Sequence, residues 1–271
     1  MALSSAQRAS YSRDHLSKIP FLTEPRHLAG PGDPRHVTHA LLAAGWSVAS
    51  APGDPRTVLT GPAQTRHRVT LDPLSPSYWQ IESADWSWCA SFGQMVPAEI
   101  VAGFTDRLVA GTPRSSIGPW ARMENAGWSV ERRPNDTREA RSPGPHQIRT
   151  EVVQVYEGTP EQMAWRIEVL PEYGGAPAWR MWISGAIPEY LLDGLAEQLV
   201  TTTPVVRGMY DPESHGALQE PSGLSPEQVV EAHFARVDAF GRRVRAHRRT
   251  RPAVSLPAPA VPSAPASVSL R

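Results

Sequence analysis

The chain has 271 residues, a formal net charge of zero and 20% charged residues. This length suits one large or two ordinary domains, each able to bury a core of its own. Zero net charge argues against binding of nucleic acid over most of the surface, although a local basic patch stays compatible with it. The single cysteine, Cys89, excludes an internal disulfide framework and a four-cysteine zinc site, and its apolar neighbours predict a buried thiol.

The N-terminal segment, residues 1–27, is predicted to be a loosely held, flexible arm. It lacks the apolar core of a secretion signal, and no stretch of the chain approaches the ~20 apolar residues that span a bilayer. We therefore expect a cytoplasmic protein without a membrane partner.

The first helix signal falls at residues 33–45. Asp33 is a good N-cap, Pro34 suits the first helical position, and Gly45 provides a left-handed stop. Strand patterns follow at residues 56–60, 67–71, 78–82 and 86–92, and predict two hairpins. A second helix begins at Pro97, with an apolar stripe made of Ile100, Val101, Phe104 and Leu108.

The same module occurs twice in the chain. Residues 39–48 reappear as residues 121–130, residues 79–82 as 165–168, and residues 97–104 as 188–195. Side chains kept in both copies are those that a shared fold needs. We therefore predict an α+β fold of two homologous modules at residues 28–111 and 118–206, each with a helix, four or five antiparallel strands and a helix. The short connection between them favours close packing, and we expect a pseudo-twofold pair.

The composition changes after residue 206. Residues 207–224 are predicted to form a linker, and residues 225–250 a basic C-terminal helix that begins with an N-cap serine and a capping-box glutamine. Proline, alanine, serine and valine dominate residues 251–271, which predicts a disordered tail.

The tryptophans divide into matched and unmatched ones. The matched ones are predicted to lie in the core: Trp46, Trp79, Trp88, Trp128, Trp165 and Trp179. Trp86 and Trp182 have no counterpart, and strand alternation places Trp182 on the opposite face from Trp179. An unmatched aromatic residue beside an arginine can be a binding hot spot, while a contact between the modules is the more common explanation. We therefore take Trp182, Arg180 and Trp86 as candidate partner contacts.

The sequence predicts no catalytic, metal or cofactor site. His36 and His39 have a spacing that suits metal ligands, but the second copy keeps neither. Glu82 and Glu168 occupy matched places, where cross-strand pairing with arginine explains them. The chain has no nucleophile elbow, phosphate-binding glycine loop or dinucleotide fingerprint. We expect a protein that is not an enzyme.

Arginines gather near the end of the C-terminal helix: Arg242, Arg243, Arg245, Arg248, Arg249 and Arg251. Such a cluster suits nucleic-acid phosphates or an acidic protein surface. It would also complement the dipole of the helix without any partner.

The chain resembles the SPDY domain family in three motifs: Leu-Asp-Pro-Leu-Ser-Pro-Ser-Tyr-Trp at residues 71–79, Ala-Ser-Phe-Gly at 90–93 and Pro-Ala-Glu-Ile at 97–100. The resemblance covers residues 28–110 well and 119–206 more loosely. Serine replaces aspartate in the naming tetrapeptide, at residue 77. The resemblance implies an actinobacterial protein of the kind found chiefly in streptomycetes, often with tandem copies, and it implies no activity or catalytic residue.

These observations predict a non-catalytic intracellular binding or adaptor protein of actinobacterial type, which engages a protein partner. The alternative is a nucleic-acid-binding accessory factor that uses the C-terminal arginines.

Overall fold

The computed structural model describes residues 3–62, 67–113, 115–133, 137–154 and 163–250. The first copy contains α2 (Arg35–Ala43), β2 (Ser47–Val48), β3 (Thr57–Thr60), β4 (Arg68–Leu71), β5 (Trp79–Glu82), β6 (Trp88–Phe92) and α3 (Ala98–Ala110). The second copy contains α4 (Pro119–Asn125), β7 (Ser129–Arg132), β8 (Arg138–Arg141), β9 (Gln147–Gln154), β10 (Met163–Leu170), β11 (Trp179–Gly185) and α5 (Glu189–Leu199). Both copies therefore have the predicted order of a helix, five strands and a second helix, and the α+β class is confirmed.

The strands of both copies form one antiparallel sheet in the order β2-β3-β4-β5-β6-β11-β10-β9-β8-β7. The copies join through their last strands, where Ser91 lies opposite Trp182 and Phe92 opposite Met181. We call this pair of strands the junction. Because Ser91 and Trp182 are also matched positions of the two copies, the register is the one that a twofold axis through this pair requires. The pseudo-twofold relation of the complete modules stays a prediction.

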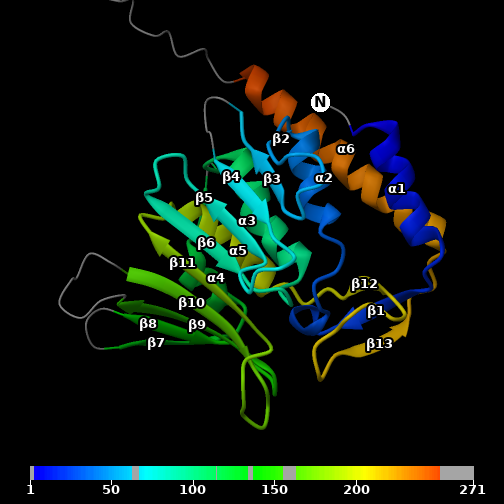
Figure 1. Cartoon of the computed structure of the whole chain (residues 1–271). Coiled ribbons are helices and arrows are strands. Elements are labelled where there is room, and N and C mark those ends of the chain that lie inside the picture. Colours follow the sequence, from blue (N-terminus) through cyan, green and yellow to red (C-terminus); the bar gives the residue numbers. More distant parts are fainter. Residues whose placement is uncertain (1–2, 63–66, 114, 134–136, 155–162, 251–271) are drawn as a thin grey trace, which may run out of the picture.

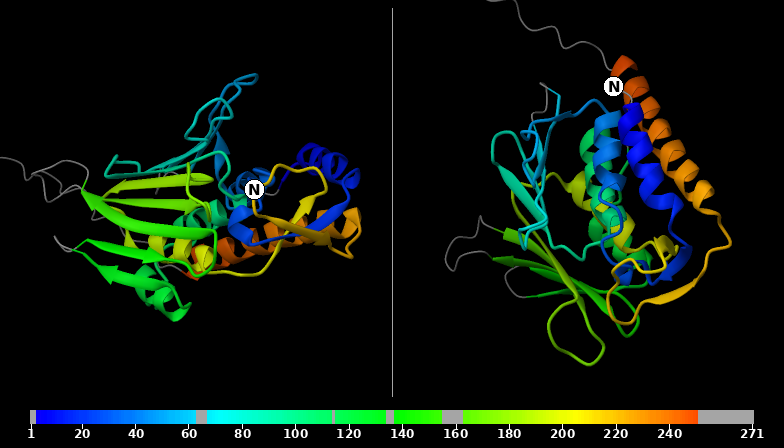
Figure 2. Two further views of the ribbon diagram at one scale, coloured as in Figure 1. Left: turned by 90° about the horizontal axis from the view of Figure 1, so that it is seen from below. Right: turned by 45° about the vertical axis from the view of Figure 1, so that its right-hand side comes forward.

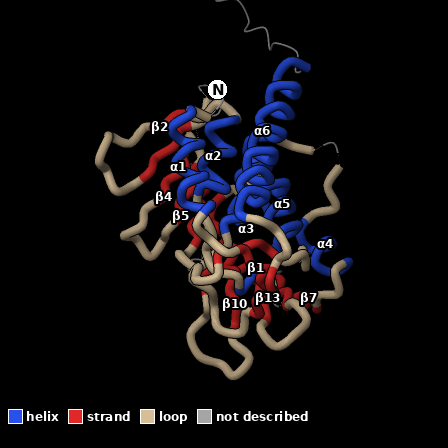
Figure 3. Tube along the Cα trace, turned by 90° about the vertical axis from the view of Figure 1, so that its right-hand side faces the viewer, coloured by secondary structure: helices blue, strands red, loops and turns tan. Residues whose placement is uncertain are grey.

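The helices of both copies cover one face of the sheet (Figures 1 and 3). The helix α3 packs against α5 behind the junction, with α2 beside α3 and α4 beside α5. The predicted apolar stripes are buried in this layer: Ile100, Val101, Phe104 and Leu108 on α3, and Leu191, Leu192, Leu195 and Leu199 on α5. The matched tryptophans are buried as well, except that Trp165 is half-buried and stacks on Trp120 at 4.7 Å between ring centroids.

The opposite face of the sheet has no described helix over it (Figure 2). Alternation along β6 points Trp88 and Ala90 into the helix layer, so that Cys89 must point the other way. The prediction of a buried thiol is therefore wrong: Cys89 is exposed, with its Sγ 3.3 Å from the Ser184 Oγ across the junction.

The segments outside the copies differ from the flexible arm and the linker that the sequence predicts. The remaining elements are α1 (Ser5–Leu16), β1 (Pro20–Glu24), the short 3-10 helix η1 (Arg26–Leu28), β12 (Val205–Gly208), β13 (Leu218–Pro221) and α6 (Pro226–Thr250). The helix α1 packs along α6, and β1 is the central strand of a second sheet, β12-β1-β13. The pairing partners of β1 are about 200 residues away in sequence, and local periodicity carries no sign of them.

The helix α6 lies where the sequence predicts a basic C-terminal helix. The Oγ of Ser225 accepts a hydrogen bond from the backbone of Gln228, whose side chain accepts one from the backbone of Ser225. This is the expected capping box. The predicted tail at residues 251–271 is outside the described residues. Within the described part, no helix is both long and apolar enough to cross a lipid bilayer.

Two matched glycines permit the contact between α3 and α5. A Cβ at Gly103 would lie 2.8 Å from the carbonyl oxygen of Gly194, and a Cβ at Gly194 would lie 2.9 Å from the carbonyl oxygen of Gly103. Both distances are shorter than van der Waals contact, and the obstacle is backbone, which cannot rotate away. Glycine is therefore required at both positions for the helices to approach this closely.

We expect Gly103→Ala and Gly194→Ala each to lower the free energy of unfolding by about 1 to 3 kcal/mol, because the added methyl group overpacks the contact between the helices. In an isolated helix the same change favours folding by about 1 kcal/mol. Urea unfolding of the full chain measures the sign. Equal or higher stability in both variants would show that the helices are not in close contact.

Candidate functional site

The uncovered face of the junction carries the first candidate site. We call it the junction surface and define it by Arg180, Trp182 and Ser184 on β11 together with Cys89 and Ser91 on β6. Trp182 is half-buried, opposite Ser91 on one side and Arg166 on the other. The side chain of Arg180 is 66% exposed. The structure therefore brings two of the three predicted contacts, Trp182 and Arg180, onto the same face of one strand.

Trp86, the third predicted contact, is placed apart from them. It lies in the turn that leads into β6, has a φ of +60° and is 70% exposed. Among the described residues no hydrogen bond or ring contact joins Trp86 to Trp182. The sequence predicted a strand from residue 86, whereas β6 begins at Trp88 and leaves Trp86 in the preceding turn.

Ion pairs between strands support the junction surface. The carboxylate of Glu168 accepts from Arg149 at 2.5 Å and lies 3.2 Å from the Nε of Arg180, and Glu151 pairs with Arg166 on the neighbouring strand. This arrangement confirms the cross-strand interpretation of Glu168. It also fixes the direction of Arg180 while leaving most of its guanidinium in solvent.

The C-terminal arginines do not act as one cluster in the structure. Arg245 and Arg248 donate to the carbonyl oxygens of Ala43 and Ala44, at 3.5 and 2.9 Å, and so satisfy the last turn of α2. Arg242, Arg243 and Arg249 are exposed, Arg243 also lines a cavity, and Arg251 is outside the described residues.

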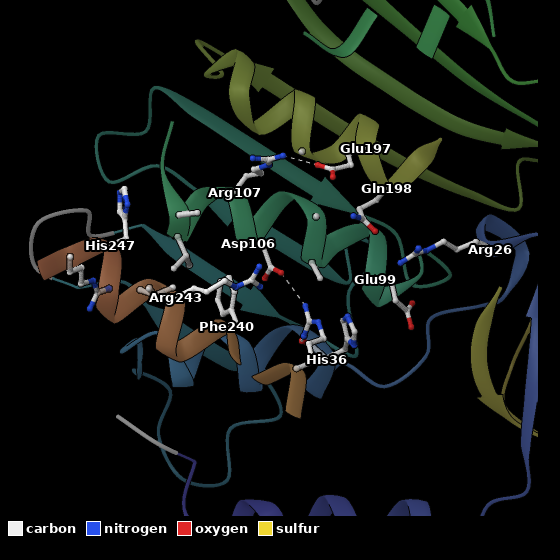
Figure 4. Close-up of a pocket in the computed structure, with 18 residues that line it drawn as sticks. Arg26, His36, Glu99, Asp106, Arg107, Glu197, Gln198, Phe240, Arg243 and His247 are labelled. Carbon is white, nitrogen blue, oxygen red and sulfur yellow. Dashed lines mark hydrogen bonds and ion pairs between the residues drawn. The ribbon is translucent and has the colours of Figure 1, made fainter. Parts of the chain in front are cut away.

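A cavity of about 780 Å³ lies between α3, α5 and α6, and we call it the main cavity (Figure 4). It is on the helix side of the molecule, away from the junction surface. The wall on α3 contributes Glu99, Asp106 and Arg107, α5 contributes Glu197 and Gln198, and α6 contributes Arg236, Phe240, Arg243, Val244, His247 and Arg248. Arg26 on η1 and His36 on α2 complete one end.

The carboxylates of the main cavity are all paired. Glu197 accepts from Arg107 at 2.7 Å, and Asp106 accepts from Arg236 at 3.2 Å. Glu99 accepts two hydrogen bonds from Arg207, at 2.7 and 2.8 Å. This pair ties β12 to α3.

Burial sets the protonation of groups inside the main cavity. It raises the pKa of Asp106, and the nearby Arg236 offsets only part of the rise. Burial would also raise the pKa of Glu99, but Arg207 outweighs it and holds that pKa well below its usual value. Burial and Arg236 together lower the pKa of His36 to about 4, so that this imidazole is neutral at pH 7.

A smaller cavity of about 270 Å³ adjoins the main one, and His36, Glu99 and Arg236 border both. Its wall holds a cluster of rings in which Tyr11 stacks on His15 at 3.9 Å and on His233 at 3.8 Å between centroids.

Sequence analysis missed this ring cluster, because Tyr11 and His233 belong to segments outside the copies and no motif marks them. His39 contacts it, with 3.0 Å between its Nδ1 and the Nε2 of His233, whereas His36 lines the cavities. The structure therefore does not bring the two predicted helix histidines to one site. Within the described residues, no group of three or more His, Cys, Asp or Glu side chains is placed to hold a metal ion.

Comparison with known families matches residues 61–114 to SPDY, a domain of unknown function (DUF317). The match contains all three motifs, so that the resemblance is confirmed for residues 61–114, while a second SPDY copy stays a prediction. No curated protein and no solved structure gives a significant match. The matched residues include β6 and α3, and therefore one half of the junction surface and one wall of the main cavity.

The ring cluster predicts a loss of stability in acid. Burial lowers the pKa of His233 from 6.5 to about 3 and that of His39 to about 4. At pH values between these two pKa values and 6.5, the unfolded chain binds more protons than the folded chain. The contribution of the two neutral histidines to the free energy of unfolding is therefore fully present above pH 6.5 and decreases as the pH falls below it.

We expect His233→Gln to lose less unfolding free energy than the wild type between pH 7 and pH 5, by roughly 1 to 2 kcal/mol. Urea unfolding of both proteins at the two pH values measures this difference. An identical pH dependence in both would contradict the assignment to His233.

Proposed function

We propose that this protein is a non-catalytic intracellular binding or adaptor protein of actinobacterial type, which engages a protein partner through the junction surface. The observation that supports the proposal most is the position of Trp182. It occupies the middle of a ten-stranded sheet on the face that no described helix covers. A large aromatic side chain at such a place is typical of the central residue of an interface.

The charges around Trp182 favour a protein surface over a polyanion. Three arginines and two glutamates alternate across β9, β10 and β11 and pair with one another, so that this part of the face has an excess of only one positive charge. Arg180 is the most exposed member of these pairs. A partner that presents an apolar side chain next to a carboxylate would cover Trp182 and take up the exposed part of Arg180.

The nucleic-acid alternative draws less support from the structure. Two arginines of the predicted cluster, Arg245 and Arg248, hydrogen-bond to the end of α2. Each is committed to backbone carbonyl oxygens of its own chain. Nucleic acid is therefore kept as an outcome of the experiment below.

The test places a photo-crosslinking amino acid at residue 182 of the full chain and, as a matched control, at Tyr210, an aromatic residue that is 90% exposed after β12. After illumination in a lysate of the source organism, we expect a protein adduct from position 182 only. With the purified partner, Trp182→Ala should weaken binding by about 100-fold, as removal of a central interface residue does, and Arg180→Ala by about tenfold. Tyr210→Ala should leave binding unchanged.

Two results would contradict the proposal. One is a partner that binds Trp182→Ala as tightly as the wild type while circular dichroism shows both folded. The other is an adduct that nuclease removes and protease does not, which would favour the accessory-factor alternative.

A further inference from the structure

The main cavity has more cationic groups than its carboxylates can pair. Five arginines and three carboxylates line it. Each carboxylate pairs with one arginine: Glu197 with Arg107, Asp106 with Arg236 and Glu99 with Arg207. Arg207 is not itself part of the wall. Among the described residues, no ion pair engages Arg26, Arg243 or Arg248. The excess positive charge is therefore located at the two ends of the cavity.

Arg26 is the strongest sign of a missing acceptor. Its Nε is buried and has no hydrogen-bond partner among the described residues. Figure 4 shows its side chain extending from η1 toward Gln198 at the α5 wall. A buried donor without a partner is unfavourable, and an anionic oxygen that enters the cavity would supply the missing acceptor.

The wall also has an apolar part. Phe240 and Val244 on α6 face Ala102, Val109 and Ala110 on α3 across the cavity. Sites for small molecules are commonly about 300 to 1,000 Å³ in volume, mostly apolar, with a few charged groups that fix the orientation of the ligand. The main cavity, at about 780 Å³, lies within this range of volume, and its wall is richer in charged groups than is usual for such sites.

From these observations we propose that the main cavity binds a small organic anion, in which a phosphate or carboxylate pairs with Arg26 or Arg243 and an apolar body lies on Phe240. The site combines walls from α3, α5 and α6, so that neither copy contains it alone. It does not depend on the proposed partner, because the cavity and the junction surface are on opposite sides of the sheet.

Isothermal titration of the full chain tests this with three probes: 1-naphthyl phosphate, 1-naphthoate and inorganic phosphate. We expect at least one naphthyl probe to bind with a Kd below about 1 mM, and inorganic phosphate to bind more weakly because it lacks the apolar body. Whether the phosphate or the carboxylate binds more tightly identifies the anion.

Matched variants on one helix locate the binding. Arg243→Gln should weaken it about tenfold, whereas Arg242→Gln should leave it unchanged, because the neighbouring Arg242 is exposed as well but does not line the cavity. Arg26→Gln should weaken it similarly at the other end. If the half-buried Arg26 proves necessary for folding, the Arg243→Gln variant alone still tests whether the probe binds in the main cavity.

Three results would overturn the proposal. The first is no binding of either naphthyl probe below about 1 mM. The second is equal binding to the wild type and to Arg243→Gln. The third is tighter binding of a single-stranded oligonucleotide that Arg242→Gln and Arg243→Gln weaken equally, because the ligand would then be a nucleic acid lying along α6.

Discussion

The structure depends on the edge-to-edge pairing of β6 with β11. Each copy alone would leave its last strand with a row of unpaired backbone groups, which is unfavourable when the edge is long and apolar on one side. Pairing the two last strands removes both edges and brings α3 and α5 into contact behind them. The close approach of Gly103 and Gly194 shows how tightly the two layers are coupled, because the helices can meet only where neither has a side chain.

This pairing also creates the two candidate sites, which lie on opposite sides of the sheet. On the uncovered side it places the half-buried Trp182 opposite the small side chain of Ser91. On the helix side the pairing brings α3 and α5 together, and the main cavity lies between these two helices and α6. Neither site exists in a single copy, so that any function of these sites needs both copies in place.

Much of the fold could be predicted from the sequence because similar local patterns occur twice in it and support one another. The matched glycines Gly45 and Gly127 both adopt positive φ, and the apolar stripes of α3 and α5 are buried residue for residue. The apolar neighbours of Cys89 predict a buried thiol. Successive side chains of a strand point to opposite faces of the sheet, however, and this alternation exposes Cys89 between two buried neighbours. The candidate site was predicted only in part: Trp182 and Arg180 followed from a comparison of the copies, but the main cavity did not. Its walls are brought together by contacts that no local pattern encodes.

The segments outside the copies explain why the main cavity could not be predicted from the sequence. β1 pairs with β12 and β13, α1 packs on α6, and Arg236 on α6 reaches both Asp106 and the carbonyl oxygen of His36. Arg207 on β12 is buried, and its bidentate pair with Glu99 anchors the second sheet to α3. Removing one member of such a pair leaves a charge unpaired in the interior, which costs far more than the pair contributes. The N- and C-terminal segments are therefore held to the central sheet and its helices by a few charged pairs, and two of these charges, Glu99 and Arg236, border both cavities. The same side chains thus line the main cavity and tie the terminal segments to α3.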